Sequence, residues 1–117
     1  MGRVLAFVPD LMDRSRVAAA AHAAGIEIEH VASPGQLASA AHDPPDLVLV
    51  DLSRPGAVEV LGALVGCRTV GFASHVDREL IARARAAGCG RVLSRSAFFG
   101  RLGGLLGEIG GEVAGAR

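Results

Sequence analysis

A serine, a histidine and an aspartate have the side-chain types of a hydrolytic triad. Ser74 and His75 are adjacent, and Asp51 ends the strongest strand signal of the chain. Adjacent residues on an extended chain point to opposite sides, so Ser74 and His75 would not face one another. The sequence also lacks the Gly-x-Ser-x-Gly turn that presents a nucleophilic serine. The trio therefore does not favour hydrolysis, and we expect the protein not to be an enzyme.

Metal-ligating residues are sparse. Asp10 could bind a metal or cap the helix expected after it, and its place before that segment favours the cap. None of the histidines has the spacing of a zinc site: His22, His30, His42 and His75. Cys67 and Cys89 are too few for a disulfide framework, so we expect free thiols. The sequence therefore predicts no metal centre and no cofactor.

These residues are carried by apolar runs that alternate with helical segments, many of them rich in alanine. The runs predict five strands, at residues 4–8, 26–31, 46–52, 68–73 and 91–94. The segments between them predict five helices, at residues 11–24, 34–42, 57–65, 77–87 and 96–113. Because neighbouring parallel strands need crossovers, this alternation predicts one α/β domain over residues 1–117, with helices on both faces of a doubly wound parallel sheet.

The polarity of the runs predicts where each strand lies. Residues 26–31 alternate apolar with polar side chains, as an edge strand does, whereas residues 46–52 are almost continuously apolar. We therefore expect the strand order 2-1-3-4-5, with the third strand in the centre. Full burial is expected for one valine or leucine in each of four strands: Val8, Leu49, Val70 and Val92.

The segment from Asp46 to Gly56 resembles the receiver domain of bacterial response regulators. A strand ends in Asp51, and Leu52-Ser53-Arg54-Pro55-Gly56 follows, with a Pro-Gly at the spacing common in that family. The resemblance extends through the five strand–helix pairs and the Ala86-Ala87-Gly88 helix stop. It implies a flavodoxin-like fold and places Asp51 at the position of the phosphoacceptor.

The chain departs from the receiver pattern at the residues that support phosphorylation. The family's acidic pair at the end of the first strand aligns with Val8 and Pro9, and only Asp10 follows. Mg²⁺ prefers carboxylate oxygens, so it should bind poorly here. We therefore expect a receiver-like interaction module that is not phosphorylated by the usual Mg²⁺-dependent route. The alternative is a working receiver that accepts phosphate on Asp51 with Mg²⁺.

The other family positions lie on the later strands. Either Ala73 or Ser74 occupies the place of the family's Ser or Thr, and Arg95 aligns with its Lys. The expected pocket around Asp51 therefore contains one more acidic residue, two arginines, a serine and a histidine: Asp10, Arg54, Ser74, His75 and Arg95. A lone buried carboxylate is costly, so we predict an Asp51–Arg95 ion pair, either direct or through one water molecule, with Arg54 also within reach.

Composition limits the partners. The 12 basic and 12 acidic residues cancel, and the chain has no Tyr or Trp, so we expect neither nucleic-acid nor membrane binding. The first residues are too short an apolar run for a signal peptide, and we expect a cytoplasmic protein. The resemblance implies a protein partner, or a second copy in a homodimer, that docks on the fourth helix, fifth strand and fifth helix, at roughly residues 77–109.

Overall fold

The computed structural model describes the backbone of residues 2–115 and the side chains of residues 2–110. Five parallel strands form one sheet in the order β2-β1-β3-β4-β5, so the expected order is confirmed. The strands are β1 (Arg3–Phe7), β2 (Glu27–His30), β3 (Leu47–Asp51), β4 (Thr69–Ala73) and β5 (Arg91–Ser94). The predicted central strand is correct, since β3 pairs with β1 on one side and β4 on the other.

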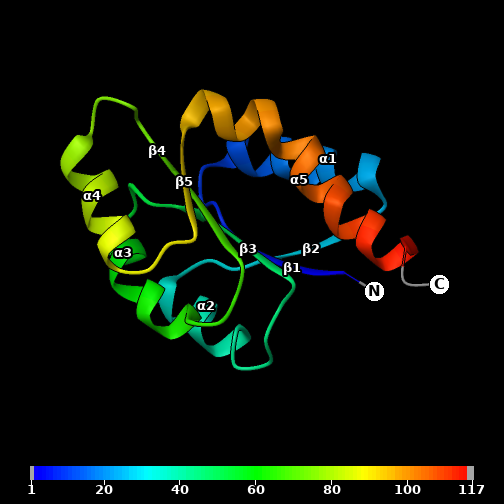
Figure 1. Cartoon of the computed structure of the whole chain (residues 1–117), viewed down its shortest axis with the longest axis horizontal. Helices are drawn as coiled ribbons and strands as arrows, with labels where there is room; N and C mark the ends of the chain where they lie inside the picture. The colour runs from blue at the N-terminus through cyan, green and yellow to red at the C-terminus, as the bar shows by residue number, and fades with distance from the viewer. Residues whose placement is uncertain (1, 116–117) are drawn as a thin grey trace.

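Helices cover both faces of the sheet (Figure 1). They are α1 (Leu11–Ala24), α2 (Pro34–Ala40), α3 (Ala57–Val60), α4 (Arg78–Ala86) and α5 (Arg95–Gly115), with a 3₁₀ turn at Leu61–Leu64 after α3. Alternate residues of β1 face opposite layers, as the period of a strand requires. Val4 and Ala6 pack in the layer with α1 and α5, and Leu5 and Phe7 pack in the layer with α2, α3 and α4.

The predicted core is correct in three of its four residues. Val8, Leu49 and Val70 are buried, whereas Val92 is only half-buried. Val92 lies on β5, which pairs with β4 on one side and, among the residues that the structure describes, has no strand on the other. An apolar residue on an edge strand keeps one flank open, so the expectation of full burial for Val92 was wrong.

Both cysteines are free, as expected, and each precedes one of two paired strands. Cys67 is half-buried before β4, and Cys89 is buried before β5. Burial raises the pKa of the Cys89 thiol. Because strands of a parallel sheet begin at the same edge, both thiols lie at the opposite end of their strands from Asp51, which ends β3.

Candidate functional site

Asp51 lies at the carboxyl end of the central strand, where ligands bind in folds of this kind. The residue is only 4% exposed. Its Oδ1 accepts hydrogen bonds from the Ser53 backbone N–H, at 3.1 Å, and from the Ser53 hydroxyl, at 2.6 Å. Its Oδ2 lies 3.4 Å from Nε of Arg54, which forms an ion pair with it. Both carboxylate oxygens of Asp51 are therefore engaged, one by Ser53 and the other by Arg54.

Arg95 pairs with a different aspartate from the one expected. Its guanidinium donates a hydrogen bond to Oδ1 of Asp13 in the first turn of α1. Arg95 begins α5, and α5 packs beside α1, so its side chain meets the start of that helix. The direct partner of Asp51 is Arg54 instead. The predicted direct Asp51–Arg95 ion pair is therefore wrong, although both arginines do neutralise carboxylates at this edge of the sheet.

The Arg95–Asp13 pair joins a buried carboxylate to a half-exposed arginine. The Asp13 side chain is 3% exposed and that of Arg95 is 50% exposed. The hydrogen bond from Arg95 to Asp13 raises the pKa of the guanidinium, and the negative charges of Asp13, Asp51 and Asp10 add to that increase. Arg95 thus remains positively charged and fixes the start of α5 to α1.

Asp13 was not among the residues predicted from the sequence, although a signal for it was present. Asp13, Val17 and Ala21 are the buried residues of α1, and they recur every four positions. That spacing places three side chains on one helix face, and two of the three are apolar. A carboxylate on the buried face of a helix requires a partner of opposite charge. The periodicity could therefore have identified Asp13 as a buried, paired residue.

Asp10 caps α1, in agreement with the interpretation favoured from sequence. Its side-chain Oδ1 accepts a hydrogen bond from the backbone N–H of Asp13 at 2.9 Å. Asp10 has extended backbone angles, as a residue before the first helical turn does. Within residues 2–110, no group of three or more His, Cys, Asp or Glu side chains is arranged to hold a metal ion.

Ser74 and His75 lie apart from the Asp51 cluster. β4 ends at Ala73, which is buried, and the exposed residues Ser74 and His75 begin the loop to α4. Together with Arg95 they line a pocket of about 580 Å³ to which Asp51 does not contribute. The residues expected around one pocket therefore form two groups, one at Asp51 and Arg54 and one at Ser74, His75 and Arg95.

Three phenylalanines form an aromatic cluster, and one of them, Phe99, lines the same pocket as the second group. Phe72 of β4 stacks on Phe98 of α5 with their ring centroids 4.3 Å apart. Phe99 meets both rings edge-on, at 5.5 Å from Phe72 and 5.0 Å from Phe98. The guanidinium of Arg16 lies over the Phe99 ring, 3.9 Å from its centroid. This aromatic cluster holds Arg16 in a defined position beside the pocket.

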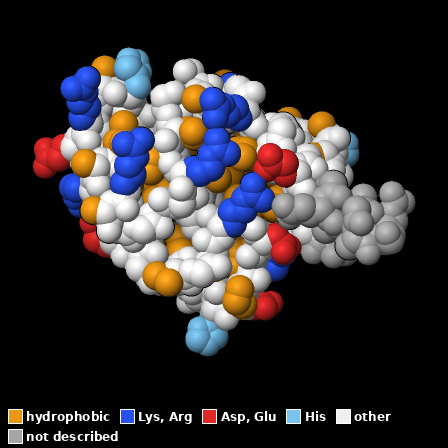
Figure 2. Space-filling model, in the orientation of Figure 1, with side chains coloured by type: hydrophobic (Ala, Val, Ile, Leu, Met, Phe, Trp, Pro, Cys, Tyr) orange, Lys and Arg blue, Asp and Glu red, His pale blue; other side chains and the backbone are white. Residues whose placement is uncertain are grey.

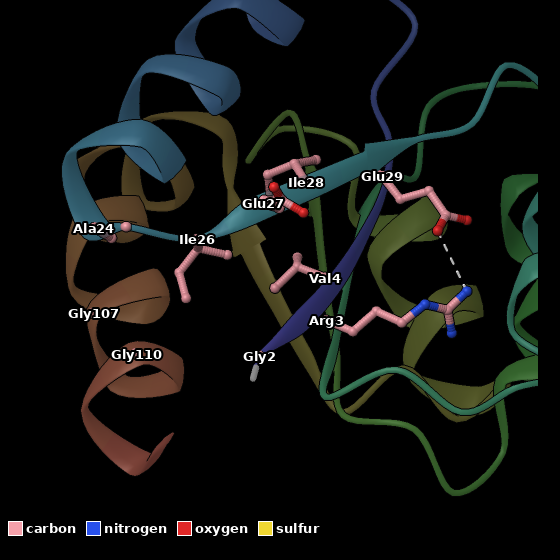
Figure 3. A pocket seen from close by; sticks show the side chains of 11 residues that line it. Gly2, Arg3, Val4, Ala24, Ile26, Glu27, Ile28, Glu29, Gly107 and Gly110 are labelled. Atoms are coloured by element: carbon pink, nitrogen blue, oxygen red, sulfur yellow. Dashed lines mark hydrogen bonds and ion pairs between the residues drawn. The ribbon is translucent and has the colours of Figure 1, made fainter. Parts of the chain in front are cut away.

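A larger pocket, of about 780 Å³, lies away from Asp51 at the opposite end of the sheet. The starts of β1 and β2 and the later part of α5 line it, and Gly107 and Gly110 leave its α5 wall without side chains (Figure 3). An ion pair between Arg3 and Glu29 crosses its rim at 3.4 Å. Among its described lining residues, the titratable side chains are those of Arg3, Glu27 and Glu29.

The structure resembles receivers of response regulators throughout. It matches a response regulator from Hahella chejuensis at 20% identity and a TM-score of 0.79, covering 93% of this chain and 95% of that one. It matches chemotaxis protein CheY4 of Vibrio cholerae at 19% identity and a TM-score of 0.76, covering 93% of this chain and 98% of that one. It also matches a CheY-like protein (tadZ) from Pseudomonas aeruginosa at 17% identity and a TM-score of 0.71, covering 93% of this chain and 99% of that one. The chain therefore has the CheY-like receiver fold.

Comparison of the sequence alone gives no relative. No model of a known protein family matches the chain, and no curated protein matches it. At identities of 20% and below, the similar structures establish the fold, and the chemistry has to be argued from the residues of this chain. Among the helices that the structure describes, none is both long and apolar enough to cross a bilayer.

Proposed function

We propose that this chain is a receiver-like protein-interaction module that works without Mg²⁺-dependent phosphorylation of Asp51. The observation that carries the proposal is the engagement of both Asp51 oxygens, by Ser53 at Oδ1 and by Arg54 at Oδ2. The Arg54 guanidinium supplies positive charge next to the carboxylate, where Mg²⁺ would have to bind. A fixed ion pair suits a surface that stays in one state, and it needs no cofactor.

The surroundings of Asp51 support this proposal. Mg²⁺ binds through oxygen ligands in near-octahedral geometry, usually with one or two carboxylates from the protein. Val8 and Pro9 supply no side-chain oxygen where receivers have an acidic pair. Asp10 caps α1, and Asp13 is held by Arg95. The two carboxylates at the start of α1 therefore already have structural partners.

A phosphorylation trial tests the proposal. The protein is incubated with acetyl phosphate and Mg²⁺, and its intact mass is measured. We expect no stoichiometric gain of one phosphoryl group, because the charge of the transferred group would lack a metal to neutralise it. A working receiver incubated in parallel shows that the reagent is active.

One result of this trial would contradict the proposal. A full phosphoryl mass gain that disappears in Asp51→Asn would overturn the proposal and support the alternative, a phosphoacceptor receiver. The Asp51→Asn chain should first give the far-UV circular dichroism of the original protein, so that loss of labelling is not loss of fold.

The partner surface we propose is the face formed by α4, β5 and α5, named here the arginine face. Six arginines and three acidic residues lie between residues 77 and 109. Figure 2 shows basic side chains spread over the side on which these elements lie in Figure 1. Four arginines of this face make no ion pair within the described part of the chain: Arg78, Arg85, Arg91 and Arg101. Val76, 73% exposed, adds an apolar side chain beside α4.

Unpaired positive charge favours a protein partner with an acidic surface. Complementary charges speed encounter and set orientation, and like charges brought together are unfavourable. A symmetric dimer through the arginine face would place the same patch against itself. The charge therefore favours an acidic protein over a second copy of the chain on this face.

Binding of a decaglutamate peptide probes the arginine face. We expect Arg85→Gln/Arg91→Gln to weaken binding about tenfold at low salt, which corresponds to about 0.7 kcal/mol for each arginine and lies within the range of about 0.2–1 kcal/mol for an exposed charge pair. Isothermal titration calorimetry measures the affinity. The control is Arg14→Gln, an exposed arginine of α1, which should weaken binding less than twofold. An equal loss in Arg14→Gln, or dimers in sedimentation velocity that vanish in the double variant, would contradict the proposal.

A further inference from the structure

The pocket beside Arg95 has the composition of an anion site. It lies between the β4–α4 loop, α1 and the first turns of α5, and its volume is about 580 Å³. Its lining contains two arginines, two serines and a histidine, and it includes no Asp or Glu: Arg16, Ser74, His75, Arg95, Ser96, Phe99 and Gly100. The volume lies within the range of about 300–1,000 Å³ typical of small-ligand sites.

Arg16 supplies the uncompensated charge of the pocket. Its guanidinium lies 3.9 Å from the centroid of the Phe99 ring, and Arg16 makes no ion pair among the described residues. Stacking on a ring occupies the face of a guanidinium and leaves the N–H groups at its edge free. The aromatic ring therefore orients Arg16 without using its hydrogen-bond donors.

Arg95 supplies donors in a fixed position. One nitrogen of its guanidinium donates to Asp13, and the group lies 5.3 Å from the centroid of Phe99. A guanidinium carries five N–H donors, so most of them remain for a ligand. Because Asp13 offsets the charge of Arg95, the attraction for an anion comes chiefly from Arg16. Arg95 contributes hydrogen-bond donors that are held in a fixed position.

We propose that this pocket binds a phosphate monoester without forming a covalent bond. A phosphate monoester carries about two negative charges at neutral pH and three strong acceptor oxygens. Arginine binds phosphate through paired N–H donors, and the Ser74 and Ser96 hydroxyls can donate to the same group. Phe99 and Gly100 leave room for the organic part of the ester. The ester is either a small molecule or a phosphorylated side chain of a partner, and both present the same group.

This site is independent of Asp51, which does not line it. The inference therefore goes beyond the proposed function and does not depend on it. A chain that resists phosphorylation could still bind the ester, and a chain that accepts phosphate on Asp51 could fail to bind it. The Asp51→Asn variant separates the two cases, since it removes the phosphoacceptor and leaves every residue of the pocket in place.

Phosphorus-31 NMR titration tests the site. The probes are glycerol 3-phosphate and a blocked Gly-phosphoserine-Gly peptide, at constant ionic strength set with sodium chloride. We expect a saturable change in the phosphorus signal, with binding about tenfold weaker in Arg16→Gln and not weakened in Asp51→Asn. Arg101→Gln is the matched control, because Arg101 is an exposed, unpaired α5 arginine outside the pocket, and it should change the affinity less than twofold.

The outcomes of the titration distinguish the two possible sources of the ester, and some of them would overturn the inference. Tighter binding of the peptide assigns the site to a phosphorylated partner, and tighter binding of glycerol 3-phosphate assigns it to a small molecule. Absence of saturation with both probes overturns the inference. So does an equal loss in Arg101→Gln, which would indicate attraction to the general charge of the face, or a loss in Asp51→Asn. Arg16 is exposed, so its substitution should leave the circular dichroism of the fold unchanged.

Discussion

Replacing Phe98 with alanine is expected to lower the free energy of unfolding by about 3–5 kcal/mol, the usual cost of deleting a buried ring. Phe98 is fully buried and stacks on Phe72 at 4.3 Å. Urea denaturation followed by far-UV circular dichroism measures the change, since the chain has no Trp or Tyr to report by fluorescence. The loss should appear in the denaturation midpoint with little change in slope.

The effect should be large because α5 has little helical stability of its own. Seven of its 21 residues are glycine, and each interior glycine costs about 1 kcal/mol relative to alanine. The helix is therefore held by its buried face, formed by Phe98, Leu102, Leu105, Leu106 and Ile109. Loss of Phe98 removes the first contact of that face, next in the chain to Phe99, which lines the pocket beside Arg95.

Gly104→Ala is the matched control on the opposite side of α5. Gly104 is exposed, and a methyl group there would meet no atom within 4 Å. This substitution should raise the free energy of unfolding by about 0.5–1 kcal/mol, because alanine restricts the unfolded chain and favours the helix. A cost below 1 kcal/mol for Phe98→Ala would show that α5 does not depend on this ring.

The fold could be predicted because its determinants are local. Continuous apolar runs indicated buried parallel strands, and the alternation at residues 26–31 indicated an edge. The structure shows both, with β3 in the centre and β2 at the edge. Val92 was the exception. The predicted strand order already placed residues 91–94 at the other edge of the sheet, and β5 lies there, so the error was to expect full burial of a residue on an edge strand.

The positions of the candidate-site residues could be predicted from the sequence, but the ion-pair partners of their charged side chains could not. Asp51 was placed correctly at the end of the central strand, and Asp10 at a helix cap. The choice between Arg54 and Arg95 as partner of Asp51 depends on the direction of long side chains. That direction is set by how α5 packs on α1, which no local pattern contains. Arg95 therefore reaches Asp13, and Arg54, three residues after Asp51, reaches Asp51.

The Arg95–Asp13 pair should contribute measurably to stability. Removing one partner of a fully buried pair costs about 3–5 kcal/mol, and exposed pairs contribute about 0–1 kcal/mol. Asp13 is buried and Arg95 is half-exposed, so Arg95→Met should cost about 2 kcal/mol. The methionine keeps most of the apolar stem, so the measured loss reports the charge and hydrogen bond. Urea denaturation provides the value.

A double-mutant cycle with Asp13→Asn isolates the interaction between the two side chains. Asparagine removes the negative charge that Arg95 neutralises, so the chain carrying both substitutions should be more stable than the sum of the two losses predicts. Residues in direct contact typically couple by about 0.5–3 kcal/mol, and we expect about 1–2 kcal/mol here. Arg54→Met, combined with Asp13→Asn, is the control and should show additive losses, because Arg54 pairs with Asp51. Additivity of Arg95→Met and Asp13→Asn would mean that the start of α5 is held to α1 by packing alone.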